Sequence, residues 1–196
     1  VSFNDAAGIE RRNVAGVAIS QDGGSSWKQS FLPSVGGFNL GDGVLGVDTK
    51  GNFYYAMIGL DFNNRSLIAV SRSTNGGKTW LRPVDASTTA GGIDDFQDKE
   101  WLAVDRSAKS RFKDNVYVSW TKFPFSGVPK IMFAASNKRG KKFQKPIVIA
   151  ESIDNNSAIQ GSMIATGPNG EVYVVWSDRS LVGVFSTVLI RLSKSI

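Results

Sequence analysis

The chain has 196 residues, enough to bury a sizeable core, with a formal net charge of +6 and a sequence pI near 9.6. It contains neither cysteine nor histidine, which excludes disulfides, thiolate sites, Ser-His-Asp triads and ordinary zinc sites. Any metal would need oxygen ligands, which favours calcium, and no apolar run approaches the ~18 residues of a membrane span.

Short apolar runs bounded by Gly, Asn, Asp and Pro dominate the chain, so we predict β-strands throughout. One unit reads as strands at 44–47, 53–58 and 66–71, followed by a turn and a fourth strand from Trp80. Later units repeat this order, with strands at 101–104, 116–120 and 130–135, and then at 162–165, 172–176 and 187–192. Residues 1–5 match 174–178, so we expect the chain to begin in the second strand of a unit.

A short motif recurs between the third and fourth strands of these units. Residues 20–27 and 73–80 share the pattern Ser-x-(Asp/Asn)-x-Gly-x-x-Trp. Residues 136–143 keep the Ser, the Gly and an aromatic residue, but Lys138 replaces the acid, and Ser195 stands where a fourth copy would begin. The spacing of about sixty residues indicates one supersecondary unit used repeatedly.

Four antiparallel strands per unit, stacked against neighbouring units, predict an all-β fold, a β-propeller of four-stranded blades. We expect one domain over residues 1–196, with blade repeats at about 1–34, 35–90, 91–150 and 151–196. This amounts to about three and a half blades, a segment of a six- or seven-bladed ring. Unpaired strand edges at both ends predict that the segment alone is marginally stable or self-associating.

The motif is expected to stabilise a turn. Glycines allow positive φ, the Asp or Asn accepts backbone hydrogen bonds, the Ser ties the ends of the turn, and the Trp packs beneath it. Direct ligand contact is the alternative role. The residues assigned to this turn are Ser20, Asp22, Gly24, Trp27, Ser73, Asn75, Gly77, Trp80, Ser136, Gly140 and Phe143.

At these residues the chain resembles the Asp-box family, also called bacterial neuraminidase repeats, of the sialidase-like superfamily. Two copies match well, and the repeat rhythm covers nearly the whole chain. The resemblance implies a β-propeller, and it is less specific for function because similar boxes occur in sialidases, other glycoside hydrolases and non-catalytic propellers. It also implies that the working face is opposite the motif turns. The loops between second and third strands and between blades are therefore the candidate functional segments.

An acidic segment at 91–101 lies in one of these loops. Asp94, Asp95, Asp98 and Glu100 are candidates to bind a ligand, to hold calcium or, for Asp98 in particular, to act as an acid. The alternative is a solvated acidic loop in which Asp98 or Glu100 caps the next strand.

Arginine is the second candidate residue type, because it binds carboxylates bidentately. Arg179 is the main candidate, next to Asp178, and an ion pair between these two is the alternative. Arg12 and Arg65 are further candidates for an anionic ligand. A sialidase also needs a Tyr nucleophile, but the tyrosines at 54, 55, 117 and 173 are expected in the core, at the end of the blades far from these loops.

We therefore expect a glycan-directed, exo-sialidase-like propeller of the glycoside hydrolase type in the full-length form, with catalysis left open. The expected partners are a glycan or glycoprotein and the remaining blades, at an extracellular or cell-surface location. No cofactor is predicted apart from calcium at 94–100, and no nucleic acid or membrane span. A non-catalytic carbohydrate- or protein-binding scaffold is the main alternative. A polyanion binder is the weakest interpretation, because basic and aromatic residues are not interleaved on one face.

Overall fold

The computed structural model describes residues 1–88, 94–154, 157–182 and 185–195. Within them the strands form four antiparallel sheets, with one short 3-10 turn, η1 (Ala6–Gly8), so the all-β prediction is confirmed. We call the sheets blades 1 to 4 in chain order.

Strand order within each blade follows chain order. Blade 1 contains β1 (Ser2–Asn4), β2 (Ala15–Ile19) and β3 (Lys28–Phe31). Blade 2 contains β4 (Phe38–Val47), β5 (Phe53–Leu60), β6 (Ser66–Ser73) and β7 (Val84–Asp85). Blade 3 contains β8 (Phe96–Val104), β9 (Val116–Phe123), β10 (Lys130–Ser136) and β11 (Ile147–Glu151). Blade 4 contains β12 (Ala158–Thr166), β13 (Val172–Val182) and β14 (Phe185–Lys194).

Most strands are longer than predicted, with β4 beginning at Phe38 and β12 at Ala158, and two further boundaries also differ. β8 begins at Phe96, because residues 96–98 pair with β9 ahead of an irregularity in the ladder. Asp98 and Glu100 therefore belong to a strand and not to an acidic loop. The fourth strand of blade 2 begins at Val84 and not at Trp80, and Pro83 between them has no N–H to donate to a ladder.

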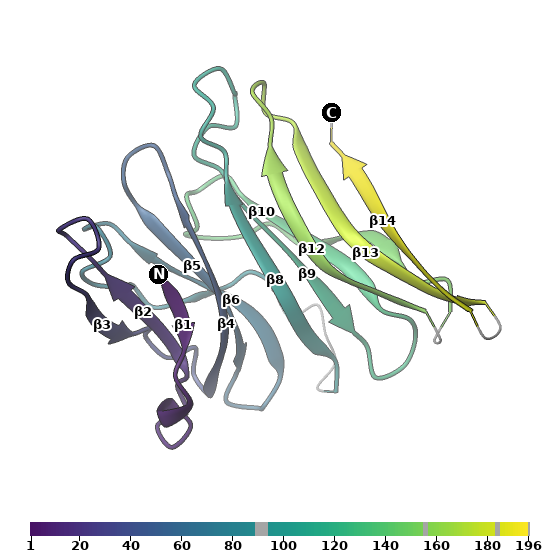
Figure 1. Ribbon diagram of the computed structural model, residues 1–196, viewed down its shortest axis with the longest axis horizontal. Coiled ribbons are helices and arrows are strands. Elements are labelled where there is room, and N and C mark those ends of the chain that lie inside the picture. The colour runs from purple at the N-terminus through teal and green to yellow at the C-terminus, as the bar shows by residue number, and fades with distance from the viewer. Residues whose placement is uncertain (89–93, 155–156, 183–184, 196) are drawn as a thin grey trace.

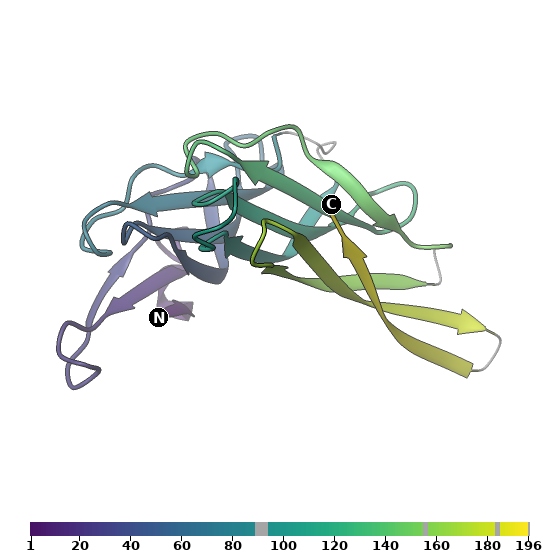
Figure 2. The ribbon, with the colours of Figure 1, turned by 90° about the horizontal axis from the view of Figure 1, so that it is seen from above.

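The four blades lie side by side (Figure 1). The first strands of blades 2, 3 and 4 are neighbours, because β4 contacts β8 and β8 contacts β12. β13 and β14 extend as a ribbon away from the other blades (Figure 2). The core consists of apolar layers between neighbouring blades. The layer between blades 2 and 3 is the largest, and it contains Tyr54, Val70, Trp120, Met132 and Phe143 among others.

A β-bulge recurs at the same place in the three first strands. The register shifts between Gly41 and Val44, between Asp98 and Trp101, and between Gln160 and Met163. Each bulge contains one residue in the left-handed region, namely Asp42 (φ 57°), Lys99 (φ 54°) and Gly161 (φ 67°). Bulges of this kind redirect side chains. Here they lie in β4, β8 and β12, the first strands of blades 2, 3 and 4, which we call the innermost strands.

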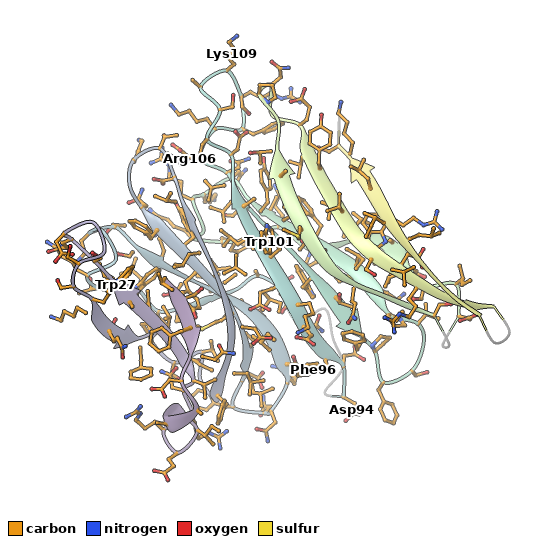
Figure 3. All side chains as sticks on the ribbon, viewed as in Figure 1. Trp27, Asp94, Phe96, Trp101, Arg106 and Lys109 are labelled. Carbon is orange, nitrogen blue, oxygen red and sulfur yellow. The ribbon has the colours of Figure 1, made fainter. Side chains whose placement is uncertain are left out.

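The antiparallel order places two kinds of connection at opposite ends of the blades. Asp94 and Phe96 lie at one end of blade 3, and Arg106 and Lys109 lie at the other (Figure 3). We call the end with Asp94 the loop face, since it contains the β1–β2, β5–β6 and β9–β10 loops. The opposite end is the turn face, which contains the motif turns.

The same kind of hydrogen bond occurs in each of the three motif turns. The Ser Oγ accepts the N–H of the Gly four residues later, at 2.7 Å for Ser20 and Gly24, 2.9 Å for Ser73 and Gly77, and 3.0 Å for Ser136 and Gly140. Asp22 and Asn75 each accept a further backbone N–H, from Ser26 and Thr79. Hydrogen bonds from Ser26 and Ser20 hold the pKa of Asp22 well below its usual range.

Trp27 and Trp80 both lie against their own turns, as predicted. The Trp27 indole donates to the Gly24 carbonyl at 3.0 Å, and a Cβ on Gly24 or Gly77 would lie within 4.0 Å of the ring of the same motif. The two residues differ in burial. Trp80 packs in the apolar layer between blades 1 and 2 and contacts Tyr55, whereas Trp27 is 51% exposed, and within the described residues no blade precedes blade 1 to cover it.

Candidate functional site

The bulges bring polar side chains of three blade segments together at the innermost strands. The Asn4 Nδ2 donates to Asp42 Oδ1 at 2.8 Å, and the Asp42 N–H donates to Asn4 Oδ1 at 2.8 Å, which joins blades 1 and 2. The Lys99 ammonium lies 3.7 Å from Asp42 Oδ2, which joins blades 2 and 3. The Asp42 and Lys99 side chains are both about half exposed. We call Asn4, Asp42, Lys99 and Glu100 the axial cluster.

Glu100 is the buried member of this cluster. It is 4% exposed, and neither carboxyl oxygen has a hydrogen-bond partner among the described residues. Burial raises the pKa of Glu100 to about 8, and the charges of Asp42 and Asp98 act in the same direction. A pKa raised in this way favours the protonated, uncharged form of the carboxyl group near neutral pH.

The residues at the matching position of the other two bulges differ from Glu100 in size and polarity. Gly43 takes the corresponding place in β4, where a Cβ would lie 1.9 Å from the Tyr55 hydroxyl. Ser162 takes it in β12, and its hydroxyl donates to Ser119 Oγ of blade 3 at 2.9 Å. The position is therefore a glycine in blade 2, a glutamate in blade 3 and a serine in blade 4. Of the two polar side chains, only that of Glu100 lacks a hydrogen-bond partner among the described residues.

Aromatic side chains project from the loop face. Phe62 in the β5–β6 loop is 80% exposed, and Phe125 in the β9–β10 loop is 82% exposed. Phe125 belongs to a concave loop segment, which is lined by residues 123–127 and Pro129. Exposed aromatic rings next to polar groups are typical of binding surfaces.

Within the acidic segment, Asp95 has structural contacts. Its carboxylate pairs with Lys122 at 2.9 Å and accepts the Phe125 N–H at 3.0 Å, which ties two loops together. Asp94 is exposed at the loop face (Figure 3). Asp98 is half-buried, and its Oδ1 accepts the N–H of Lys99 at 2.7 Å. Residues 91–93 of this segment lie outside the described residues.

The predicted arginines are placed separately. Arg65 forms a 2.7 Å ion pair with Asp61 of its own loop, and Arg12 lies over the Phe38 ring at 5.6 Å. The predicted alternative of an Asp178–Arg179 ion pair is wrong, because neighbours along a strand point to opposite faces. Asp178 instead accepts a hydrogen bond from Arg191 Nε of β14 at 3.0 Å, and Arg179 is exposed on β13.

The tyrosines lie in the core or towards the turn face, as predicted. Tyr54 and Tyr55 are fully buried, and Tyr117 nearly so. The Tyr54 hydroxyl donates to Asp48 in a turn of the turn face at 2.9 Å, and Tyr173 lies 5.4 Å from the Lys194 ammonium. Burial raises the pKa of Tyr55, and the charge of Glu100 adds to this.

No group of three acidic side chains among residues 1–88, 94–154, 157–182 and 185–195 is placed to hold a metal ion. Calcium binding near 94–100 therefore stays a prediction from the sequence. In the same residues, no helix has the length and apolar character needed to cross a membrane.

Sequence reasoning missed Asn4, Asp42 and Lys99. A signal was present, because the segments 41–43, 98–100 and 160–162 occupy the same place in three repeats. Aligning the repeats at these bulges would have indicated Asp42 and Lys99, whereas Asn4 lies in β1 and has no place in that alignment.

Comparison with known proteins identifies structures that share this fold. No family model matches the chain. A sialidase of Bacteroides fragilis is 26% identical in an alignment of 111 residues, which covers 43% of this chain and 20% of that protein. A solved microbial sialidase, Hz136, superposes with a TM-score of 0.60 at 16% identity over 90% of this chain and 38% of its own. An α-L-arabinanase of Penicillium chrysogenum, solved with arabinobiose, gives 0.68 at 16% identity over 92% of this chain and 54% of its own.

The chain has the sialidase-like β-propeller fold. The predicted resemblance is thereby confirmed at the level of the fold. The chain spans between one fifth and about half of the length of these relatives.

Proposed function

We propose that the chain is part of a glycan-directed, sialidase-like propeller in which the axial cluster and the loop face contact the sugar. The observation that carries this proposal is the axial cluster itself. It combines a carboxylate, an ammonium group, an amide and a neutral acid at the innermost strands. Such a mixture of donors and acceptors suits a ligand rich in hydroxyl groups. The similarity to sialidases and to an arabinanase supports a carbohydrate ligand.

Two carboxyl groups of β8 are the candidates for acid–base chemistry. Asp98 is the candidate acid predicted from the sequence, and it lies next to the Lys99 bulge. Glu100 is the stronger candidate on physical grounds, because burial keeps it protonated near neutral pH. Asp94, which precedes β8, and Arg179 of β13, both exposed, are proposed to contact the ligand.

A non-catalytic carbohydrate- or protein-binding role is the second candidate, and one observation favours it. All four tyrosines lie within the described residues. Tyr54 and Tyr173 lie towards the turn face, and the Tyr55 hydroxyl, which is next to Gly43 of the β4 bulge, is buried and donates to the Gly16 carbonyl. A Tyr nucleophile of the sialidase type would therefore come from outside this chain. The location is proposed to be extracellular or at the cell surface, with a glycan or glycoprotein and further blades as partners.

Turnover of a fluorogenic sialoside and of an arabinofuranoside by the intact protein tests the first candidate. We expect hydrolysis of one of them, with a loss of at least tenfold in kcat for Glu100→Gln or Asp98→Asn. Glu171→Gln, which changes a half-buried carboxylate in the β12–β13 turn of the turn face, is the control. Binding to immobilised glycans without turnover would support the second candidate, and absence of both would overturn the proposal.

A further inference from the structure

An open apolar groove separates blades 3 and 4 at the turn face. It has a volume of about 790 Å³. Blade 3 contributes the stacked rings of Tyr117 and Phe133, whose centroids are 5.8 Å apart, together with Ile147 of β11. Blade 4 contributes Val172 and Val174 of β13. A hollow of this size between two blades contrasts with the filled layer between blades 2 and 3.

Strand register shows what fills the corresponding place between blades 2 and 3. The ladders put Tyr117 at the position of Tyr54, and Phe133 at the position of Val70. They likewise put Val172 and Val174 at the positions of Val116 and Val118. Tyr54, Val70, Val116 and Val118 belong to the same buried cluster as the motif aromatic Phe143, which is 2% exposed.

The neighbouring layer follows the same rule. Trp80, the motif aromatic of blade 2, packs between blades 1 and 2 with Val17 and Tyr55. The turn glycines make the same kind of contact, since a Cβ on Gly77 would lie 3.3 Å from Ile19 of blade 1, and one on Gly140 would lie 3.0 Å from Tyr54 of blade 2. Each motif turn therefore packs against the preceding blade.

The outer edge of blade 4 has the complementary feature. Within the described residues β14 pairs with β13 alone, whereas β2, β6 and β10 each have a further strand on their outer side. Val188, Ile190 and Leu192 of β14 are more than half exposed. Ser195 takes the place of Ser73 and Ser136, which begin the motif, and its N–H donates to the Val172 carbonyl at 2.9 Å.

We propose that this groove is the docking site of a fourth motif turn of the same polypeptide, starting at Ser195. Its aromatic side chain, seven residues after Ser195 as in the other copies, fills the groove, and the strand that follows pairs with β14. The rim carries Arg111, Lys113 and Lys194, which favours the acidic form of the motif, as at Asp22, over the Lys138 form.

The first experiment grafts the occupant. Residues 21–33, which hold the acidic motif turn of blade 1 and β3, are copied onto the chain directly after Ser195, in place of Ile196. We expect the midpoint of thermal unfolding to rise by several degrees relative to the chain of 196 residues. The matched control is the same extension with Ser in place of the copied Trp, and it should recover little of that rise. An equal rise for both extensions, or none for either, would overturn the proposal.

The second experiment uses the intact protein. Ile147 is 57% exposed in this chain, so the substitution Ile147→Lys is tolerated if the groove is open. If the groove is occupied, a charge is buried there and the unfolding midpoint falls by several degrees. Ile153→Lys, at a more exposed isoleucine of the loop after β11, is the control that should leave the midpoint unchanged. An intact protein that tolerates both substitutions equally would contradict the proposal even where the shorter chain does not fold.

Discussion

The indole of Trp80 meets the ring of Tyr55 edge to face, with centroids 6.0 Å apart and an interplanar angle of 83°. The contact joins the motif turn of blade 2 to its second strand, in the layer that also holds Val17 of blade 1. Edge-to-face pairs contribute beyond their burial. The aromatic residue of the motif thus links the turn to packing between blades.

Truncating this ring should cost more than truncating its counterpart in blade 1. We expect Trp80→Ala to lower the free energy of unfolding by about 3 kcal/mol, because a ring is removed from an apolar layer. Trp27→Ala is the matched control and should change it by less than about 1 kcal/mol, since that indole is half exposed. Chemical denaturation of the two variants measures the difference, and equal losses would show that the motif aromatic acts through its turn alone.

The degenerate motif of blade 3 offers a stabilising substitution. In the other two copies the third residue accepts the N–H of the residue four positions later: the Ser26 N–H donates to Asp22 Oδ1, and the Thr79 N–H donates to Asn75 Oδ1. Lys138 is exposed and cannot accept a hydrogen bond. We expect Lys138→Asp to raise the free energy of unfolding by about 1 kcal/mol. Lys138→Ala, measured in the same denaturation series, separates the new hydrogen bond from the simple loss of a charge in the basic run.

The blades could be predicted because their signals are local. The motif serines and glycines act within five residues of one another, and Gly24, Gly77 and Gly140 all take the positive φ that their turns require. Strand alternation and the repeat then fix the order of strands. Trp27 shows the limit of this reasoning, because it lies against its own turn and is still 51% exposed, whereas Trp80 is packed by residues of the neighbouring blade that lie far from its motif in the sequence.

The candidate site could be predicted only in part because it depends on register between strands. Glu100 was named from an acidic run, but its burial follows from the bulge that places it in β8. Asp42 and Asn4 meet across two blades, and neither stands in a recognisable motif. The pairing of Asp178 with Arg191, in place of Arg179, likewise follows from the alignment of β13 with β14.

Glu100 should make the stability of the chain depend on pH. The ordinary pKa of a glutamate, 4.5, is raised to about 8 in the folded state by burial. Between these values the folded chain binds more protons than the unfolded chain, so the free energy of unfolding falls as pH rises. The slope from this residue is up to about 1.4 kcal/mol per pH unit, and it vanishes below about pH 4.5 and above about pH 8.

Glu100→Gln should remove this slope and leave the variant more stable than the parent at pH 8. Glu10→Gln, at an exposed glutamate of blade 1, should leave the dependence on pH intact. Urea denaturation from pH 5 to pH 8.5 measures all three proteins. Parallel curves for the parent and Glu100→Gln would mean that Glu100 is ionised throughout, and its role as a proton donor would then be untenable.

The exposed rings of the loop face should contribute to ligand binding and not to stability. Phe62 and Phe125 bury little of their surface in the chain, so Phe62→Ser and Phe125→Ser should change the free energy of unfolding by less than about 0.5 kcal/mol. If a sugar packs on these rings, each substitution should weaken glycan affinity by about fivefold to tenfold, which corresponds to about 1 kcal/mol.

Trp27→Ala serves as the control for this measurement, because it removes an exposed aromatic ring from a motif turn of the turn face. Calorimetric titration with a glycan that the intact protein binds compares the three variants. A loss for Trp27→Ala, with full affinity retained by both Phe variants, would move the binding surface to the turn face. It would also separate the axial cluster from the ligand, since the rings that flank the sugar would then lie at the opposite end of the blades.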